Sequence, residues 1–461
     1  MNTDIEQALD TFRLQDAGYA RSERYYDGQH DLRFASDQFE NTFGTLFREF
    51  ALNLCPVVCD AVRDKLRITE FSVDGMSDAF TRDGLVASKD ATHTIWARNR
   101  GGALAGEIHK EALKTGDAYA LVWPDANGSA RIFPNRARSI AVVYDDEGSR
   151  ELIRAAKIWR DRTKHIRLNM FYPDRIERYI SRNTAEMTYP DAGGFVPIDR
   201  RNAGSLPALP REEDARAGSP RSDAVIPNPY SRVPVFHFAN NADLGAPGRS
   251  ELADAIPIQD GLNKSVLDML VAMEFSAFRQ RWVAGIELKY DKDGNAVPPF
   301  KSGVDHIWVS EDPAARFGDL GAAELDQFLK VKDSFRVDIA SVTGTPLHYF
   351  MQNVRGFPSG ESLKRAESRF IAKVRDRQEN FGQVWAELME FALRIEGLAD
   401  TRLIAEWEDP SPISERELLE NLILKRQLGL GSEQALIEAG YGASDVRKIL
   451  TTENTEKAKA I

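Results

Sequence analysis

Side chains that could bind a metal ion or act as a nucleophile are few in this sequence and lie far apart. Its two cysteines, Cys55 and Cys59, do not have the spacing of a redox Cys-x-x-Cys pair, and two are too few for a cysteine-only zinc site. On a helix they would share one face, where we expect small buried hydrophobic residues. The seven histidines show no metal-ligand spacing: His30, His93, His109, His165, His237, His306 and His348. The sequence therefore predicts no metal site and no cofactor.

Motifs for nucleotide binding and nucleophilic catalysis are also missing. The sequence contains neither a G-x-x-x-x-G-K-[ST] phosphate loop nor a G-x-G-x-x-G turn. Residues 356–360 place a serine between glycines, but no strand precedes them, and Ser359 is better interpreted as a helix N-cap. Residues 291–294 begin like a calcium loop, lack its glutamate and indicate a hairpin turn. Because no carboxylate pair has surroundings suited to acid–base catalysis, we do not expect an enzyme.

Composition and charge are those of a soluble globular protein. The chain has 461 residues, 42% hydrophobic and 28% charged, which suggests about three structural units. A net charge of −11 argues against tight, non-specific DNA binding by the whole surface, because such proteins are usually basic. The sequence has no run of about 18 apolar residues, so we expect no transmembrane helix. The N-terminus lacks the features of a signal peptide, which predicts a cytoplasmic protein.

The charge is distributed unevenly along the chain. Residues 131–182 contain 13 Lys and Arg against 7 Asp and Glu, whereas residues 385–461 contain 9 against 15. Two segments of opposite sign could dock partners or pack head to tail between subunits. They could equally be two solvated faces.

The N-terminal part is expected to contain helices followed by antiparallel strands. Apolar spacing predicts helices at 3–26, 37–66 and 92–115, and Pro56 could kink the second. Alternating residues then predict strands at 117–123, 130–133, 139–144, 151–160, 164–172 and 175–181. The turn sequences between them indicate a meander rather than βαβ units. Residues 184–231 are rich in Pro, Gly, Arg, Ser and Asp, which predicts a long surface loop.

The C-terminal half is expected to contain two helices around a small β insert. The helices are predicted at 257–281 and 322–342, and the insert has strands at 282–290 and 304–309. A loop at 343–358 then leads to a helix that runs from Ser359 to Gly397, about three times the typical length. Such a helix implies a spine on which other units pack. Shorter helices follow from about residue 412.

The order of these elements and several short motifs resemble the portal proteins of tailed bacteriophages, in particular those of siphophages. The strongest motif is Pro-Ser-Gly-Glu-Ser-Leu-Lys at 358–364, which opens the long helix. The other motifs are Arg24–His30, Asn53–Val62, Ile95–Asn99, Ala112–Tyr119 and Phe381–Trp385. The resemblance extends from about residue 20 to about residue 400, and none of its motifs is catalytic.

This resemblance implies an α+β fold with portal architecture: a helical stem, a small β clip, a mixed α/β wing that contains a long spine helix, and a helical crown. On this chain the wing would comprise residues 1–248 together with the spine at 359–411. The other parts would be the stem helices at 249–281 and 322–342, the clip at 282–321, the tunnel loop at 343–358 and the crown at 412–461.

The resemblance also implies the function of a structural, DNA-conducting protein without catalysis of its own. Portal proteins form a homo-oligomeric ring, expected here to be a dodecamer, at one capsid vertex, and double-stranded DNA passes through it during packaging and ejection. The implied partners are further copies of the chain, the terminase large subunit, the head–tail adaptor, and the major capsid and scaffold proteins. The protein would belong to the virion after assembly in the host cytoplasm, without contact with a membrane.

The tunnel loop and the second stem helix would line the DNA channel. The candidate loop residues are His348, Gln352, Asn353 and Arg355. They are polar and mostly uncharged, which suits a channel through which DNA must slide. Lys330 and Lys332 could touch DNA from the stem, or be ordinary exposed helix charges.

The clip is rich in aromatic residues: Trp282, Tyr290, Phe300 and Trp308. These side chains could dock the terminase or the adaptor, because aromatic residues are enriched at interfaces. They could equally form the core of a small β unit.

Two other functions remain open from the sequence. The first is a cytosolic α+β enzyme, such as a hydrolase with an unrecognised carboxylate site, which predicts a closed pocket with perturbed carboxylates. The second is another structural protein of the phage head, such as a minor head protein. A minor head protein should lack the paired stem helices around an insert.

Overall fold

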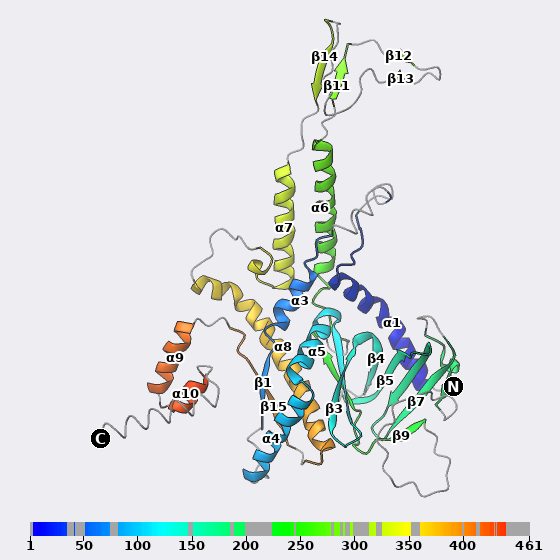
Figure 1. The fold of residues 1–461 in the computed structure, drawn as a ribbon, viewed down its shortest axis with the longest axis vertical. Helices are drawn as coiled ribbons and strands as arrows, with labels where there is room; N and C mark the ends of the chain where they lie inside the picture. The colour runs from blue at the N-terminus through cyan, green and yellow to red at the C-terminus, as the bar shows by residue number, and fades with distance from the viewer. Residues whose placement is uncertain are drawn as a thin grey trace. The chain divides into compact units, whose positions relative to one another are not determined.

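A computed structural model gives the fold of the protein (Figure 1). The residues that it describes are 3–34, 41, 51–73, 82–145, 151–184, 189–198, 224–243, 246–277, 281–285, 289–290, 296–297, 313–319, 325–351, 360–398, 401–411, 415–427, 429 and 431–438. Helices and antiparallel sheets are both present, so the predicted α+β class is confirmed. No described helix combines the length and hydrophobicity that a transmembrane segment needs.

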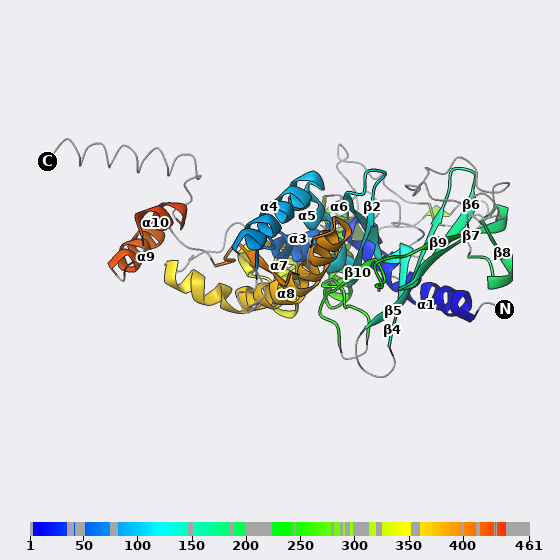
Figure 2. The same cartoon turned by 90° about the horizontal axis from the view of Figure 1, so that it is seen from below.

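Helix α1 (Thr3–Tyr26) has the predicted bounds and covers one face of a sheet. Its buried residues, which include Ile5, Leu9 and Phe12, recur at helical spacing. They pack against inward-facing residues of the sheet such as Ile158 and Leu168. Figure 2 shows α1 along strands β4 and β5. Burial of this apolar stripe therefore fixes the N-terminal helix in place.

The two other predicted N-terminal helices are interrupted, and most of residues 37–50 of the first lie outside the described residues. Helix α3 (Cys55–Arg63) replaces the end of the helix predicted at 37–66, because residues 51–54 are not helical. Pro56 lies in its first turn, where a missing N–H costs nothing, so it begins the helix instead of kinking it. The helix predicted at 92–115 is divided into α4 (Arg82–Arg98) and α5 (Gly101–Thr115). The break falls at Arg100, whose φ of 54° is left-handed.

The predicted meander forms two antiparallel sheets instead of one. Three strands make the first, in the order β10-β2-β3: β2 (Asp117–Pro124), β3 (Ala130–Arg136) and β10 (Val235–Ala239). The second contains β4 (Ile140–Tyr144), β5 (Leu152–Arg160), β6 (His165–Phe171), β7 (Arg175–Thr184), β8 (Phe195–Pro197) and β9 (Val225–Pro227). A turn of 3₁₀ helix at Ala137–Ser139 separates β3 from β4 and lets the chain change sheets.

The region predicted as one loop at 184–231 is anchored near both ends. Strand β8 pairs with β7 through Tyr179 and Pro197, and β9 pairs with β7 through Arg175 and Pro227. The prediction of a plain loop was therefore wrong at these ends, because strands of three residues are too short for alternation to reveal them. Residues 199–223 lie outside the described part of the chain.

Two helices flank a β insert, as predicted. They are α6 (Ala255–Ala277) and α7 (Leu325–Thr343), which run side by side in Figure 1. Between them lie β11 (Arg281–Ala284), β12 (Lys289–Tyr290), β13 (Ala296–Val297) and β14 (Arg316–Asp319). β11 pairs with β14 and β12 with β13, both antiparallel. The strand predicted at 304–309 lies outside the described residues.

The long helix is confirmed as α8 (Gly360–Ile395), with 36 residues. After it, β15 (Leu403–Trp407) pairs with β1 (Ile68–Val73), which no sequence pattern predicted. Helices α9 (Glu415–Gln427) and α10 (Ser432–Glu438) follow. The chain divides into two compact units: residues 1–357 with 372–408, and residues 358–371 with 409–461.

An aromatic cluster fixes the C-terminal part of α8 against α4 and α5. Trp385 is fully buried, and its Nε1 donates a hydrogen bond to Nε2 of His109 at 2.8 Å. Phe381 stacks on the His109 ring, and Trp96 packs edge-on against Trp385. Burial lowers the pKa of His109 to about 3, so the imidazole is neutral in the folded protein. His109 is therefore a core residue, as expected for a histidine outside a metal site.

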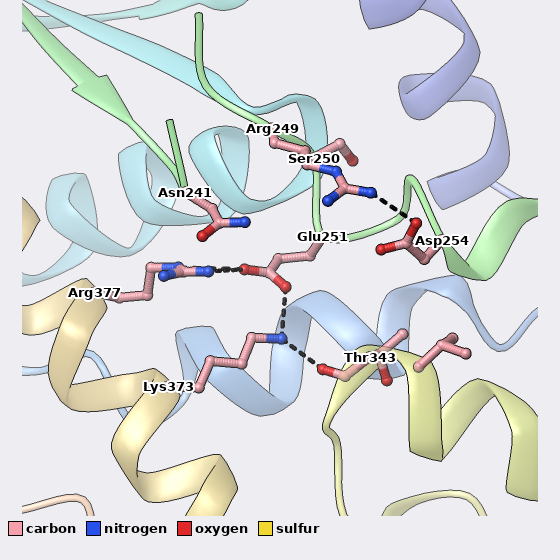
Figure 3. Close-up of a pocket in the computed structure, with 9 residues that line it drawn as sticks. Asn241, Arg249, Ser250, Glu251, Asp254, Thr343, Lys373 and Arg377 are labelled. Atoms are coloured by element: carbon pink, nitrogen blue, oxygen red, sulfur yellow. Dashed lines mark hydrogen bonds and ion pairs between the residues drawn. The ribbon is translucent and has the colours of Figure 1, made fainter. Parts of the chain in front are cut away.

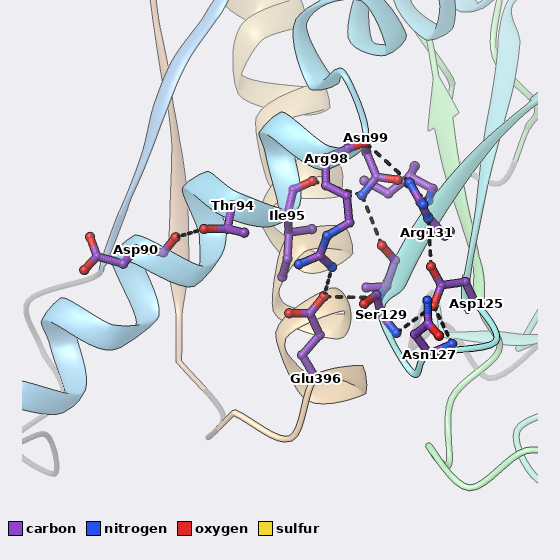
Figure 4. Close-up of polar contacts among 12 residues, drawn as sticks. Asp90, Thr94, Ile95, Arg98, Asn99, Asp125, Asn127, Ser129, Arg131 and Glu396 are labelled. Carbon is purple, nitrogen blue, oxygen red and sulfur yellow. Dashed lines mark hydrogen bonds and ion pairs between the residues drawn. The ribbon is translucent and has the colours of Figure 1, made fainter. Parts of the chain in front are cut away.

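Side chains near the ends of α4 and α8 bind backbone groups of strand β3 (Figure 4). The Asn99 amide donates to the carbonyls of Ile95 and Ala130 at 2.9 and 3.1 Å, and its oxygen accepts from the Ile132 N–H at 3.0 Å. At the end of α8, Glu396 accepts from the Ala130 N–H at 3.1 Å and pairs with Arg98. Side chains of the Ile95–Asn99 motif thus connect two helices and a strand.

Candidate functional site

The second helix of the pair, α7, carries equal numbers of positive and negative side chains. Lys330, Lys332 and Arg336 are matched by Asp326, Asp333 and Asp338. Lys330 is exposed and Lys332 half-buried, and within the part of the chain that the structure describes neither forms an ion pair. The two predicted lysines can therefore meet a ligand, although the helix as a whole has no net charge to hold a polyanion tightly.

The segment after α7 turns sharply and then packs. Thr343 Oγ1 donates to the Ile339 carbonyl at 2.7 Å, and Gly344, with φ of 64°, ends the helix in the left-handed conformation that favours glycine. Thr345 is buried, and one turn of 3₁₀ helix, Leu347–Tyr349, follows. The first half of the predicted loop therefore packs against the C-terminal end of α7.

Of the four predicted loop residues, the structure describes one. His348 is half-buried, and its ring lies 4.6 Å from that of Tyr349, which is more exposed. Gln352, Asn353 and Arg355 lie outside the described residues. Whether the four residues lie together is therefore not tested, and their role in a channel stays a prediction.

Of the four residues predicted for the clip, Trp282 is described with its side chain. It lies on β11 opposite Gly318 of β14 and is 44% exposed, as is its neighbour Phe317. Tyr290 forms part of β12, and Phe300 and Trp308 lie outside the described residues. Trp282 pairs with Gly318 and Phe317 with Val283, so this strand pair carries one exposed aromatic side chain on each face.

A buried ionic cluster lies where α6 begins and α7 ends (Figure 3). Glu251, four residues before α6, is bound by Lys373 at 2.5 Å and by Arg377 at 3.0 Å, both from α8. The Lys373 ammonium also donates to the Thr343 carbonyl at 2.8 Å. A polar cavity of about 150 Å³ adjoins the cluster. Sequence reasoning missed these residues, for which the one available signal was a pair of cations four residues apart beside the apolar stripe of α8.

Burial alone would raise the pKa of Glu251. The charges of Lys373 and Arg377 and their hydrogen bonds outweigh burial and hold the pKa below its usual value. Glu251 is therefore ionised in the folded protein. A buried carboxylate of this kind needs its cationic partners, because losing one leaves charge uncompensated.

A second polar cluster contains an aspartate, a histidine and two tyrosines. Asp117 accepts from Nε2 of His237 at 2.7 Å, from the Gly248 N–H at 2.8 Å and from the Tyr19 hydroxyl at 2.6 Å. Nδ1 of His237 lies 2.7 Å from the Tyr144 hydroxyl. Burial and the charge of Asp117 raise the pKa of Tyr144, so the phenol keeps its proton and is a poor nucleophile. The cluster fastens α1 and the segment before α6 to strand β2.

The remaining candidates for chemistry are structural in the described part of the chain. Both cysteines are buried and unpaired, as predicted, and burial raises the pKa of Cys55 to about 12. Among the described residues, no group of three His, Cys, Asp or Glu side chains could hold a metal ion. The Glu251 and Asp117 clusters therefore serve to connect helices and strands.

Residues 70–460 match the family described as phage portal protein, SPP1 Gp6-like, and the chain belongs to this family. The predicted resemblance is thereby confirmed. The family is one of structural proteins, in agreement with the expectation that the chain is not an enzyme.

Two curated relatives carry the name portal protein. That of Mycobacterium phage L5 is 26% identical over 249 residues, and that of Mycobacterium phage D29 is 25% identical over 248 residues. Each match covers 51% of this chain and 51% of the relative. The chain thus spans about half the length of the curated relatives that it matches.

Similar solved structures come from gene transfer agent (GTA) particles. A chain from the neck of an empty particle, computed with C6 symmetry, matches with a TM-score of 0.49 and 11% identity, over 92% of this chain and 98% of that chain. A chain from the virion of a native particle matches with a TM-score of 0.47 and 11% identity, over 94% and 99%. 

Proposed function

We propose that this protein is one subunit of a homo-oligomeric ring, a dodecamer, at one vertex of a phage capsid, and that double-stranded DNA passes through the ring. The observation that supports the proposal most directly is the pair of helices α6 and α7 around a β insert, followed by the long helix α8, in a chain of the portal family. The ring would become part of the virion after assembly in the host cytoplasm.

The parts of the chain take the following roles in this proposal. The stem is formed by residues 249–281 and 322–342, the clip by 282–321 and the tunnel loop by 343–358. Residues 1–248 and 359–411 form the wing, and residues 412–461 the crown. The exposed aromatic side chains of the paired strands β11 and β14 suit the clip for docking the terminase large subunit and the head–tail adaptor. The capsid and scaffold proteins would contact the wing and crown.

DNA must slide through the proposed ring without being held. Each phosphate that a protein neutralises adds affinity and salt dependence, so a strongly basic channel would retain DNA. The balanced charge of α7 and the net charge of −11 fit a channel that guides DNA weakly. Lys330 and Lys332 would supply brief contacts with phosphates as DNA passes.

Charge reversal on α7 tests the role in DNA conduction. The double variant Lys330→Glu, Lys332→Glu should form normal rings and package several-fold less DNA, because acidic side chains at these positions repel phosphate. The control is Arg160→Glu, Arg162→Glu, which reverses two exposed cations next to the β5–β6 turn. Packaging would be measured as the yield of DNA-filled heads per ring. An unchanged yield in the α7 variant would contradict DNA contact by these lysines.

A further inference from the structure

We propose that Lys373 is a positioning residue of the tunnel loop: it holds the C-terminal end of α7, and with it the start of the loop, against the spine helix α8. The proposal rests on the proposed function in that the loop is taken to face DNA. Its structural part concerns three elements whose contacts are described.

The contact with α7 uses a group that a helix leaves free. The last four carbonyl groups of a helix have no partner within it, and a cation near them is favoured. Thr343 is the last residue of α7, and its carbonyl oxygen accepts from Lys373 Nζ at 2.8 Å. The next residue, Gly344, is the point at which the chain leaves the helix. Lys373 therefore binds at the first residue of the loop.

The contact with Glu251 fixes the lysine itself. The Glu251 and Lys373 side chains are 8% and 16% exposed, so their ion pair is shielded from water and salt. Glu251 is held in turn by Arg377, by the Asn240 amide at 3.1 Å and, through its backbone N–H, by the Leu113 carbonyl at 2.9 Å. The Lys373 ammonium group is thus held by Glu251 and can position the end of α7.

The two cations of α8 make different contacts. Their variants can therefore distinguish a role in positioning the end of α7 from a role in overall stability. Lys373 and Arg377 lie one helical turn apart and both bind Glu251. Lys373 also contacts Thr343, whereas the side-chain bonds described for Arg377 go to Glu251 and Asp376. Loss of either cation weakens the same buried ion cluster, but only loss of Lys373 should release the end of α7.

Hydrogen–deuterium exchange on the full-length ring tests this difference. In Lys373→Met, which keeps an unbranched side chain but removes the charge, amides of residues 344–351 should exchange about ten-fold faster than in the wild type. Lys373→Arg should restore most of the protection, and the matched control Arg377→Met should leave it near the wild-type value. Equal exchange in Lys373→Met and the wild type would overturn the proposal, as would equal acceleration in Arg377→Met. If Lys373→Met does not fold, Lys373→Gln replaces it in the same comparison.

Packaging measured on the same rings links the contact to function. Lys373→Met should form rings and package several-fold less DNA, and the arginine variant should recover packaging. Faster exchange with normal packaging would contradict a role of this contact in packaging. A replacement of residues 352–356 by glycine and serine tests the loop separately. Normal packaging in that variant would contradict a DNA role for this loop segment, while the exchange result would still decide whether Lys373 fixes the end of α7.

Discussion

At the scale of single residues, close packing around Trp96 decides which substitutions the start of α5 can accept. Gly101 and Gly102 are neighbours at the start of α5, but a Cβ atom on Gly101 would lie 2.0 Å from the Trp96 ring, whereas one on Gly102 would meet nothing within 4 Å. The indole of Trp96 cannot move away easily, because it packs against Phe71 and Trp385. The two glycines therefore offer a matched pair.

Gly101→Ala should lower the free energy of unfolding by about 1–3 kcal/mol, the usual cost of overpacking a core. Gly102→Ala should leave it unchanged or raise it by up to about 1 kcal/mol, because alanine favours the helix. Urea unfolding of the two variants measures both values. Equal stability of the two variants would contradict the close contact with Trp96.

The neutral, buried His109 makes stability depend on pH. In the unfolded chain this imidazole takes up a proton near pH 6.5, whereas in the folded chain its pKa is about 3. The unfolded state therefore binds more protons between these values, and stability falls as the pH is lowered from 6.5, by at most about 1.4 kcal/mol per pH unit.

His109→Gln should remove this part of the pH dependence, because the glutamine oxygen can still accept the Trp385 hydrogen bond but does not titrate. The difference in unfolding free energy between wild type and variant, measured from pH 7.5 to pH 5, should change in favour of the variant as the pH falls. A constant difference over this range would show that His109 is not held neutral.

At the scale of elements, the side chains of Asn99 and Glu396 bind backbone groups of strand β3 in the place of a neighbouring strand. Asn99→Ala removes three hydrogen bonds and leaves the Ile132 N–H without its partner, so we expect a loss of about 1–3 kcal/mol in the free energy of unfolding. The control is Asn135→Ala on the same strand, whose exposed amide bonds to the Phe133 carbonyl two residues away. Chemical denaturation compares the two, and a loss of similar size in both would contradict the special role of Asn99.

The elements that sequence patterns predicted well are long and periodic. α1, α6, α7 and α8 were found within about four residues of their bounds, because each carries apolar side chains at helical spacing. β1 and β15 were missed because they are short and pair across more than 300 residues of sequence. The division of one predicted meander into two sheets also escaped prediction, since alternation identifies strands but not their partners.

The candidate site was predictable only in outline. The resemblance indicated a loop after α7, and polar residue types suggested a role in DNA passage. The Glu251 cluster could not be found in this way, because its members lie on three elements and meet only in the folded chain. Lys373 and Arg377 look like ordinary helix charges until Glu251 and the end of α7 are placed beside them.

At the scale of the whole molecule, the central claim is that the chain forms a closed ring with a channel. Helix α7 has exposed apolar side chains, among them Leu329, Val331 and Val337. An oligomer can bury apolar side chains that one chain alone leaves exposed. In the proposed ring, neighbouring copies of the chain would cover them.

The native mass of the purified protein, measured by light scattering together with negative-stain images of the same fraction, tests this claim most directly. Twelve copies of 51.6 kDa give about 620 kDa, and closed cyclic symmetry predicts round particles with a central hole. A compact dimer or tetramer without a hole would contradict the ring.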